Sequence, residues 1–357
     1  MAAKSSFVRR IGVFAVEVAV VWVVGTLFKN LLPAYPVGVM TVLCINAVLA
    51  LSWNLVSGFT GQFSLGHAGF MAVGAYTSAL LMMKAKWPFL PAFVAAGLFS
   101  AFVGFLVGFP SLRLAGDYLS VVTLGFMYII TAILNNTTDL TGGGLGLPGI
   151  PYKTTLPVAC VTLVITLWIL SNLVHSKQGR CFVAVKEDEI AAQSVGVDTT
   201  HYKILAFIIS SFFAGLGGAM TGHYMMYLRP DIFSYLKTVE SVSMVILGGL
   251  GSLTGSILGA VFITVLPEIF RNLATLFGGM GMVAAANFLR RGWMVFYAVM
   301  FLAIMLARPQ GLLGRKELTW EGVRKRFGRF GRKAPPTVFP GPPDAVQPPN
   351  SSEGVKA

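Results

Sequence analysis

Charged residues are scarce in this chain of 357 residues, because Asp, Glu, Lys and Arg together make up only 11% of it. Soluble domains carry about 25% charged residues, which cover a water-facing surface. Hydrophobic residues make up 55% of the chain, and the mean hydropathy is +0.74. Most of the chain must therefore lie in lipid. The composition predicts an integral membrane protein and excludes an ordinary soluble domain.

Cysteine and histidine are also rare. The three cysteines, Cys44, Cys160 and Cys181, show no C-x-x-C spacing and predict neither a disulfide framework nor a zinc site. The four histidines are scattered at positions 67, 175, 201 and 223. A membrane-embedded enzyme would need a cluster of His, Asp and Glu or a nucleophile with its base. We therefore expect no catalytic residues and no metal site, and an enzyme is the least favoured functional class.

Acidic residues are outnumbered, and the net charge is +13. Ten of the 27 basic residues lie from Arg308 onward, in a stretch that suits anionic lipid headgroups on the cytoplasmic side better than DNA. We expect membrane lipid and no nucleic acid as a partner. With both termini inside, 18 basic residues fall inside and 9 outside, but without those ten the counts are 8 and 9. The tail alone thus supports this orientation.

Long apolar runs predict an all-α, polytopic membrane protein with about ten transmembrane or partly spanning helices. Residues 1–10 are expected to form a cytoplasmic N-terminus, followed by a permease domain over 11–307 whose first helix is retained rather than cleaved. A basic, then Pro-rich tail over 308–357 is expected to be disordered and cytoplasmic. The candidate segments are 11–32, 37–56, 68–83, 89–109, 118–134, 155–174, 204–224, 238–247, 254–271 and 292–307, with polar interruptions at 135–154, 175–203 and 272–291.

Two glycine-rich segments break the apolar runs with the same G-x-x-G-x-x-[ST] spacing. Irregular backbone at membrane depth is tolerated where it lines a cavity or is buried by protein, so two such breaks point to broken helices around a translocation path. Close helix packing is the alternative, because a chain with 40 glycines matches short patterns by chance. The residues concerned are Asn54, Gly58, Gly61, Gln62, Ser64, Gly66 and His67 in the first segment and Gly248, Gly251 and Thr254 in the second.

Two residues near these segments have alternative interpretations. His67 is expected to be an ordinary buried histidine. Glu240 is an ionisable group inside a short apolar run, which makes it a candidate for the path. It is equally well explained as a carboxylate at a helix end in the membrane interface. The polar loop over 135–146 is either a binding or gating loop or a plain surface turn.

The connector over residues 175–203 predicts one short helix. Glu187, Asp188 and Glu189 suit its N-terminus, and Gly196 supplies its C-terminal stop. Asp198 can then cap the next spanning helix. A short, charged, well-capped helix between two membrane spans is either a docking site for a soluble partner or a solvated loop.

Five sequence blocks, in order and over roughly residues 40–314, resemble the LivM-type permeases of bacterial branched-chain amino acid importers. The blocks are LSWNLVSGFTGQFSLGHAGFMAVGAYTSALL, SLRLAGDYLSVVTLGF, NNTTDLTGGGLGL, GRCFVAVKEDEIAAQSVGV and RPQGLLG. The resemblance implies a pore-forming subunit of the inner membrane that moves Leu, Ile or Val by alternating access. It implies pairing with a LivH-type permease, two cytoplasmic ATPases and a periplasmic binding protein. The stretch 272–291 and the tail match nothing in the family.

The resemblance also implies that the connector couples the permease to an ATPase. The residues that would carry this coupling are Gly179, Arg180, Glu187, Asp188, Glu189, Ala191, Ala192 and Gly196. The chain lacks a G-x-x-x-x-G-K-[ST] phosphate loop, so ATP and Mg would bind to the partner ATPases, and we expect no cofactor on this chain. Related permeases carry urea, amides or other amino acids, which leaves the substrate open. A secondary transporter is a further alternative, although Glu17, Glu240 and Glu268 are few carboxylates for ion coupling.

Overall fold

The computed structural model of the chain describes residues 2–111 and 118–279, together with scattered residues between 282 and 314. The regular secondary structure of this part is helical apart from one pair of two-residue strands. Within it, six helices are long and apolar enough to cross a membrane. They are Ala34–Phe59, Phe89–Ser111, Tyr118–Asn136, Leu156–Val174, Thr199–Met225 and Leu253–Gly279. The chain is thus an all-α, polytopic membrane protein.

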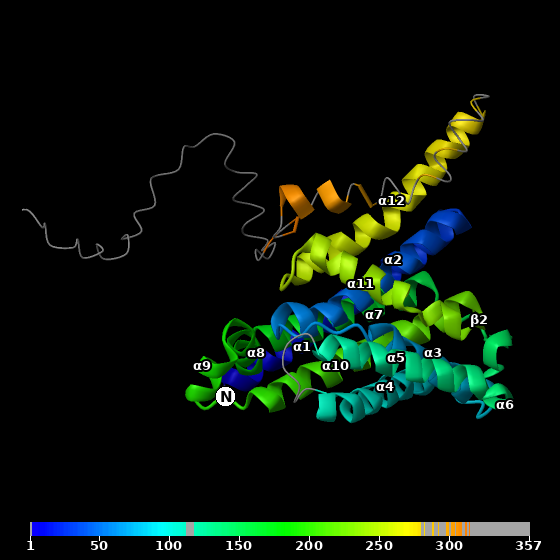
Figure 1. The fold of residues 1–357 in the computed structure, drawn as a ribbon. Coiled ribbons are helices and arrows are strands. Elements are labelled where there is room, and N and C mark those ends of the chain that lie inside the picture. The colour runs from blue at the N-terminus through cyan, green and yellow to red at the C-terminus, as the bar shows by residue number, and fades with distance from the viewer. Residues whose placement is uncertain are drawn as a thin grey trace, which may run out of the picture. The chain divides into compact units, whose positions relative to one another are not determined.

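The helices follow one another with short connections (Figure 1). The principal ones are α1 (Ala2–Leu31), α2 (Ala34–Asn54), α3 (His67–Met83), α4 (Phe89–Ser111), α5 (Tyr118–Asn136), α7 (Leu156–Val174), α8 (Lys177–Glu187), α9 (Glu189–Ser194), α10 (Thr199–Met225), α11 (Tyr235–Gly248) and α12 (Leu253–Gly279). Shorter elements are a π-helical turn (Leu55–Phe59), α6 (Thr138–Thr141) and the 3-10 turns Gly143–Leu145 and Pro230–Phe233. Strands β1 (Leu147–Pro148) and β2 (Tyr227–Leu228) are antiparallel.

Nine of the predicted segments fall on helices, and the tenth, 292–307, has only scattered described residues. Three details of the prediction were wrong. The first helix begins at Ala2 rather than at residue 11. Helix α12 continues to Gly279, although an interruption was expected from 272, because residues 272–277 contain neither proline nor glycine. The connector forms two helices instead of one. The predicted tail lies outside the described residues beyond 314.

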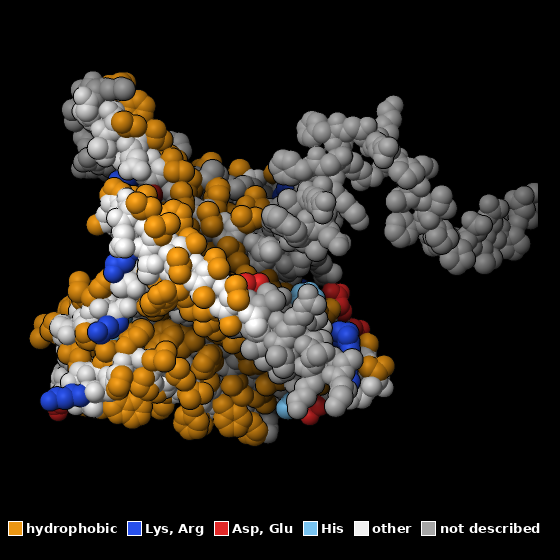
Figure 2. Space-filling model, turned by 180° about the vertical axis from the view of Figure 1, so that it is seen from behind, with side chains coloured by type: hydrophobic (Ala, Val, Ile, Leu, Met, Phe, Trp, Pro, Cys, Tyr) orange, Lys and Arg blue, Asp and Glu red, His pale blue; other side chains and the backbone are white. Residues whose placement is uncertain are grey.

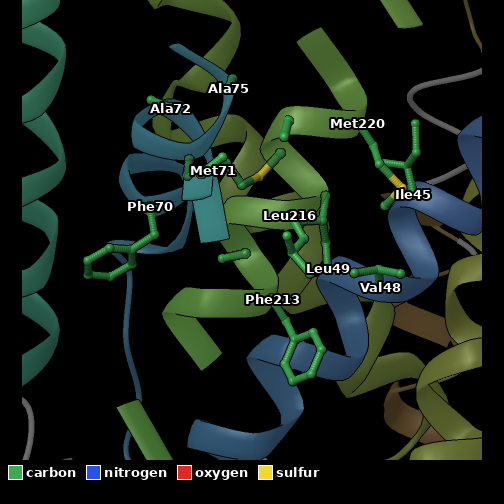
Figure 3. Packing of buried hydrophobic residues seen from close by; sticks show 14 of the residues in the cluster. Ile45, Val48, Leu49, Phe70, Met71, Ala72, Ala75, Phe213, Leu216 and Met220 are labelled. Carbon is green, nitrogen blue, oxygen red and sulfur yellow. The ribbon is translucent and has the colours of Figure 1, made fainter. Parts of the chain in front are cut away.

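Helix α10 packs between α2 and α3, and their apolar side chains form the core (Figure 3). Leu49 of α2, Met71 of α3 and Leu216 of α10 all belong to this cluster. A Cβ on Gly218 would overlap the Met71 carbonyl oxygen, so the two backbones approach closely through glycine. Lipid gives helices no hydrophobic drive to associate with one another, and close packing through small residues supplies the contact instead.

The two ends of the bundle differ. Helices α8 and α9 lie at one end, which we call the connector end, and α6 and β2 lie at the other (Figure 1). At that opposite end the polar loop is folded, because Leu147 pairs with Leu228 and the Tyr227 hydroxyl donates to the Leu145 carbonyl. Between the ends, hydrophobic side chains cover most of the described surface that Figure 2 shows, as a bilayer core requires.

Candidate functional site

The two glycine-rich segments lie against each other at the connector end. The first begins where α2 passes into the π-helical turn Leu55–Phe59. Asn54 joins the segments, because its Nδ2 donates to the Ser252 carbonyl at 3.0 Å and its Oδ1 accepts from the Gly251 nitrogen at 2.9 Å. A Cβ on Gly58 would lie 2.6 Å from the Gly251 nitrogen. Residues from far apart in the sequence therefore form one irregular region.

Each segment connects two helices, α2 to α3 and α11 to α12, instead of interrupting a single helix. In the second segment, a Cβ on Gly248 would overlap the Gly255 carbonyl oxygen, which holds α11 and α12 together closely. Thr254 lies in the first turn of α12, where its Oγ1 is 3.3 Å from the Ser252 Oγ. The glycines of the second segment therefore have a packing role, independent of any part in a translocation path.

Most polar groups of the first segment have partners within the chain. The His67 Nε2 lies 2.9 Å from the Ser52 Oγ and is buried, as expected of an ordinary core histidine. The Trp53 Nε1 donates to the Ser64 carbonyl at 2.9 Å. A Cβ on Gly66 would lie 2.6 Å from a backbone oxygen of α5, so this turn needs glycine.

Gln62 is the exception. The residue is only 6% exposed, yet neither amide atom has a hydrogen-bond partner among the residues that the structure describes. Buried polar groups are nearly always paired, and an unsatisfied one costs about 1–3 kcal/mol. The Gln62 amide is therefore a buried donor and acceptor that a water molecule, a ligand or another conformation of the chain can satisfy.

The connector forms two capped helices. The Ser176 hydroxyl accepts from the Gly179 nitrogen at the start of α8, and a Cβ on Gly179 would overlap the Val174 carbonyl. Asp188 has extended backbone and ends α8, and its carboxylate accepts from two backbone nitrogens of α9. Gly196 follows α9 with a φ of +84°. The capping roles predicted for Asp188 and Gly196 are thus present, but Glu187 ends α8 rather than starting a helix.

The surface of the connector combines exposed and anchored residues. Arg180 and Ala191 are exposed, whereas Ala192 is buried. Glu189 is held by Lys203 of α10 at 2.5 Å and accepts a hydrogen bond from the Thr199 hydroxyl. Two apolar side chains, at positions 190 and 195, are each 78% exposed. Helix α9 is therefore fixed to the bundle on one side and presents apolar groups on the other.

Lys186 links this connector to the glycine-rich segments. It lies near the C-terminus of α8, and its Nζ donates to the Gly58 carbonyl at 2.5 Å. A Cβ on Gly61 would lie 3.2 Å from the Lys186 Cγ, and Gly61 itself has a φ of +73°. Sequence reasoning missed this residue, although a lysine directly after the apolar run FVAV was a usable signal.

A second polar group lies between α2, α11 and α12. Lys237 and Glu240 form an ion pair at 2.8 Å, and the Lys237 Nζ donates to the Asn46 Oδ1 at 3.2 Å. The Asn46 Nδ2 lies 3.5 Å from the Glu240 Oε1 and 3.0 Å from the Thr264 Oγ1. The prediction identified Glu240 but missed its partners Lys237 and Asn46. Asn46 lies 194 residues away in the sequence, and Thr264 joins the group through Asn46.

A third polar group lies farther along the same helices. The Tyr35 hydroxyl of α2 donates to Glu268, and the Arg271 Nη2 donates to the Tyr35 oxygen at 2.6 Å. Arg271 and Glu268 of α12 are also paired at 3.3 Å. We call the strip that carries these two polar groups and the irregular region around Gly58 the α2–α11–α12 seam. Among the described residues, no three His, Cys, Asp or Glu side chains are grouped to hold a metal ion.

Comparisons with known proteins agree with the resemblance of the five sequence blocks. A family model described as the permease component of branched-chain amino acid transport systems matches residues 35–307. The LivM permease protein of Salmonella typhimurium is 34% identical over 311 residues, which cover 78% of this chain and 69% of that protein. The LivM protein of Escherichia coli is 33% identical over the same shares, and its LivH protein is 23% identical over 76% of this chain and 92% of LivH. No solved structure matches the chain.

Proposed function

The chain belongs to the family of permease components of branched-chain amino acid transport systems, and on this basis we propose that its substrate path runs along the α2–α11–α12 seam. One observation carries the proposal. Polar groups lie at three successive depths of this strip, from Tyr35 and Glu268 through Asn46 and Glu240 to the irregular region around Gly58. Charged groups inside a membrane protein mark ion and substrate pathways.

The seam faces a second permease in this proposal. Lys237 and Glu240 have 21% and 36% of their side chains exposed in the isolated chain, at a depth where lipid is an unfavourable neighbour. A homologous LivH-type subunit that covers the seam would enclose the pair between two protein surfaces. The path then lies between the two permeases and not through the densely packed core of α2, α3 and α10.

The connector end is assigned to the cytoplasm, with both chain termini on that side of a bacterial inner membrane. Ile190 of α9 and Val195 directly after this helix, both 78% exposed, contact a cleft in one of two ATPase subunits. Those subunits bind and hydrolyse ATP with Mg. The opposite end, with β1 and β2, receives a periplasmic binding protein loaded with Leu, Ile or Val.

Alternating access gives Lys186 a mechanical role. Movement of α8 and α9 by the ATPases shifts the Lys186 ammonium, which holds the Gly58 carbonyl in the described conformation. Gly58 in turn packs on Gly251, so both glycine-rich segments respond to one contact. The Gln62 amide beside them has no partner among the described residues, and this supports a second conformation or a passing ligand as its partner.

The test is ATP-driven uptake by the assembled complex in liposomes. The tagged chain is purified with a LivH-type permease and two ATPases, and radiolabelled leucine is supplied with its binding protein. We expect uptake that depends on ATP and on all partners. Uptake by the lone chain in an ion gradient would show a secondary transporter instead. Uptake of urea or an amide, but not of leucine, would place the chain with its relatives of other specificity.

A further inference from the structure

We propose that Asn46, Lys237, Glu240 and Thr264 form a binding station for a zwitterionic amino acid midway across the membrane. In this station Glu240 binds the substrate's ammonium group, and Lys237 binds its carboxylate. The inference rests on the proposed function and adds the residues that bind the two charged ends of the substrate on that path.

The station lies at the middle of two spanning helices. Asn46 is near the centre of the apolar span Ala34–Phe59, about 18–20 Å from either end at about 1.5 Å per residue. Thr264 is similarly near the centre of α12, Leu253–Gly279. Placing two opposite charges at this depth is costly unless each charge is paired, and stability alone gives little reason to keep such a pair.

Asn46 and Thr264 orient the charged side chains of Lys237 and Glu240. Asn46 is only 3% exposed, and its amide contacts both the Lys237 Nζ and the Glu240 Oε1. Thr264 fixes the Asn46 amide through a hydrogen bond of 3.0 Å. Lys237 and Glu240 keep 21% and 36% of their side chains accessible. Both charged side chains are therefore partly accessible, while the Asn46 that orients them is buried.

A zwitterion suits this pair because no charge is left unpaired when it binds. The substrate opens the Lys237–Glu240 ion pair and replaces it with an ammonium–Glu240 pair and a Lys237–carboxylate pair. An unpaired charge in a low-dielectric environment costs several kcal/mol per ion, and this exchange avoids that cost. Urea or a neutral amide brings no charges to replace those that it separates. The station therefore favours amino acids over neutral substrates of related permeases.

A structural ion pair is the competing explanation, and a double substitution separates the two. Removing one partner leaves a buried charge and destabilises a protein, whereas replacing both by neutral residues is often harmless. If Lys237 and Glu240 only stabilise the fold, Lys237→Met combined with Glu240→Gln should restore whatever either substitution alone disturbs. If they bind substrate, the double variant should fold and assemble but still fail to transport.

The experiment uses the complete complex in liposomes with radiolabelled leucine and its binding protein. We compare the wild type, the double variant, and a control that carries Thr131→Val. The control removes a side-chain hydrogen bond of 2.9 Å within α5, which lies outside the seam. Uptake and ATP hydrolysis are measured in the same vesicles, and assembly is checked by co-purification of the ATPases.

We expect leucine uptake by the double variant to be at least tenfold lower than uptake by the wild type, while the loaded binding protein still stimulates ATP hydrolysis. The control should stay within twofold of the wild type. Leucine uptake by the double variant at the wild-type rate would overturn the proposal and leave the transport function intact. Absence of ATP-dependent leucine uptake by the wild-type complex would instead contradict the proposed function itself, so the two failures are distinguishable.

Discussion

Replacing Lys186 by methionine should uncouple ATP hydrolysis from uptake. Methionine keeps an unbranched apolar side chain beside Gly61 but cannot donate to the Gly58 carbonyl, which Lys186 contacts at 2.5 Å. A hydrogen bond from a charged group contributes about 1.5–3 kcal/mol. If the bond exists in only one of two conformations, its loss shifts their ratio by about tenfold to a hundredfold, at about 1.4 kcal/mol for each factor of ten.

The assay measures leucine taken up per ATP hydrolysed by the reconstituted complex. We expect Lys186→Met to lower this ratio by tenfold or more while hydrolysis continues and the ATPases still co-purify. The matched control is Lys84→Met, because the Lys84 Nζ donates to the Asp139 carbonyl at 2.9 Å at the opposite end of the bundle. Equal effects of the two substitutions, or an unchanged ratio for Lys186→Met, would refute the role of the contact in coupling.

Three further predictions concern packing, the buried amide and the connector. Gly218→Ala should lower the thermal denaturation temperature, because the new Cβ would overlap a carbonyl of α3. The control Gly125→Ala, which has open space around its Cβ, should leave the temperature equal or higher. The reverse order would contradict the packing of α3 on α10. Gln62→Leu should raise that temperature, since it removes buried polar atoms that have no partner among the described residues, and it should lower uptake if the amide binds a ligand or pairs in a second conformation. Unchanged uptake would exclude a role of the amide in transport. Asp188→Ala should weaken co-purification of the ATPases, because loss of the N-terminal cap lowers the stability of α9 by about 1 kcal/mol. Full recovery of the ATPases would argue against docking through α9.

The sequence predicted the helices well because long apolar runs have one main physical outcome in a membrane. Segments such as 89–109 and 155–174 fall on α4 and α7 almost without change. The end of α12 was missed because polar residues such as Asn272 were taken as a break, although a helix tolerates them where neither proline nor glycine follows directly. The split between α8 and α9 was missed because a single extended residue, Asp188, both ends one helix and caps the next.

The candidate site was only partly predictable, because its contacts join residues that lie far apart in the chain. Repeated spacing singled out Gly58 and Gly251, and the structure places them in contact. Nothing in the local sequence connects Asn46 with Lys237, which are 191 residues apart, or indicates that Lys186 reaches a backbone carbonyl 128 residues away. Such contacts depend on how the helices pack, and that packing was not available from periodicity alone.

Reagent access to engineered cysteines tests the path along the α2–α11–α12 seam most directly. In a complex in which Cys44, Cys160 and Cys181 are replaced by serine, Thr264→Cys is compared with Phe102→Cys, whose native side chain on α4 is 54% exposed. A charged, membrane-impermeant thiol reagent should label Thr264→Cys in one nucleotide state, and leucine should slow the labelling. Phe102→Cys should stay unlabelled in lipid. Labelling of Phe102→Cys but not of Thr264→Cys in any state would contradict a path along the seam.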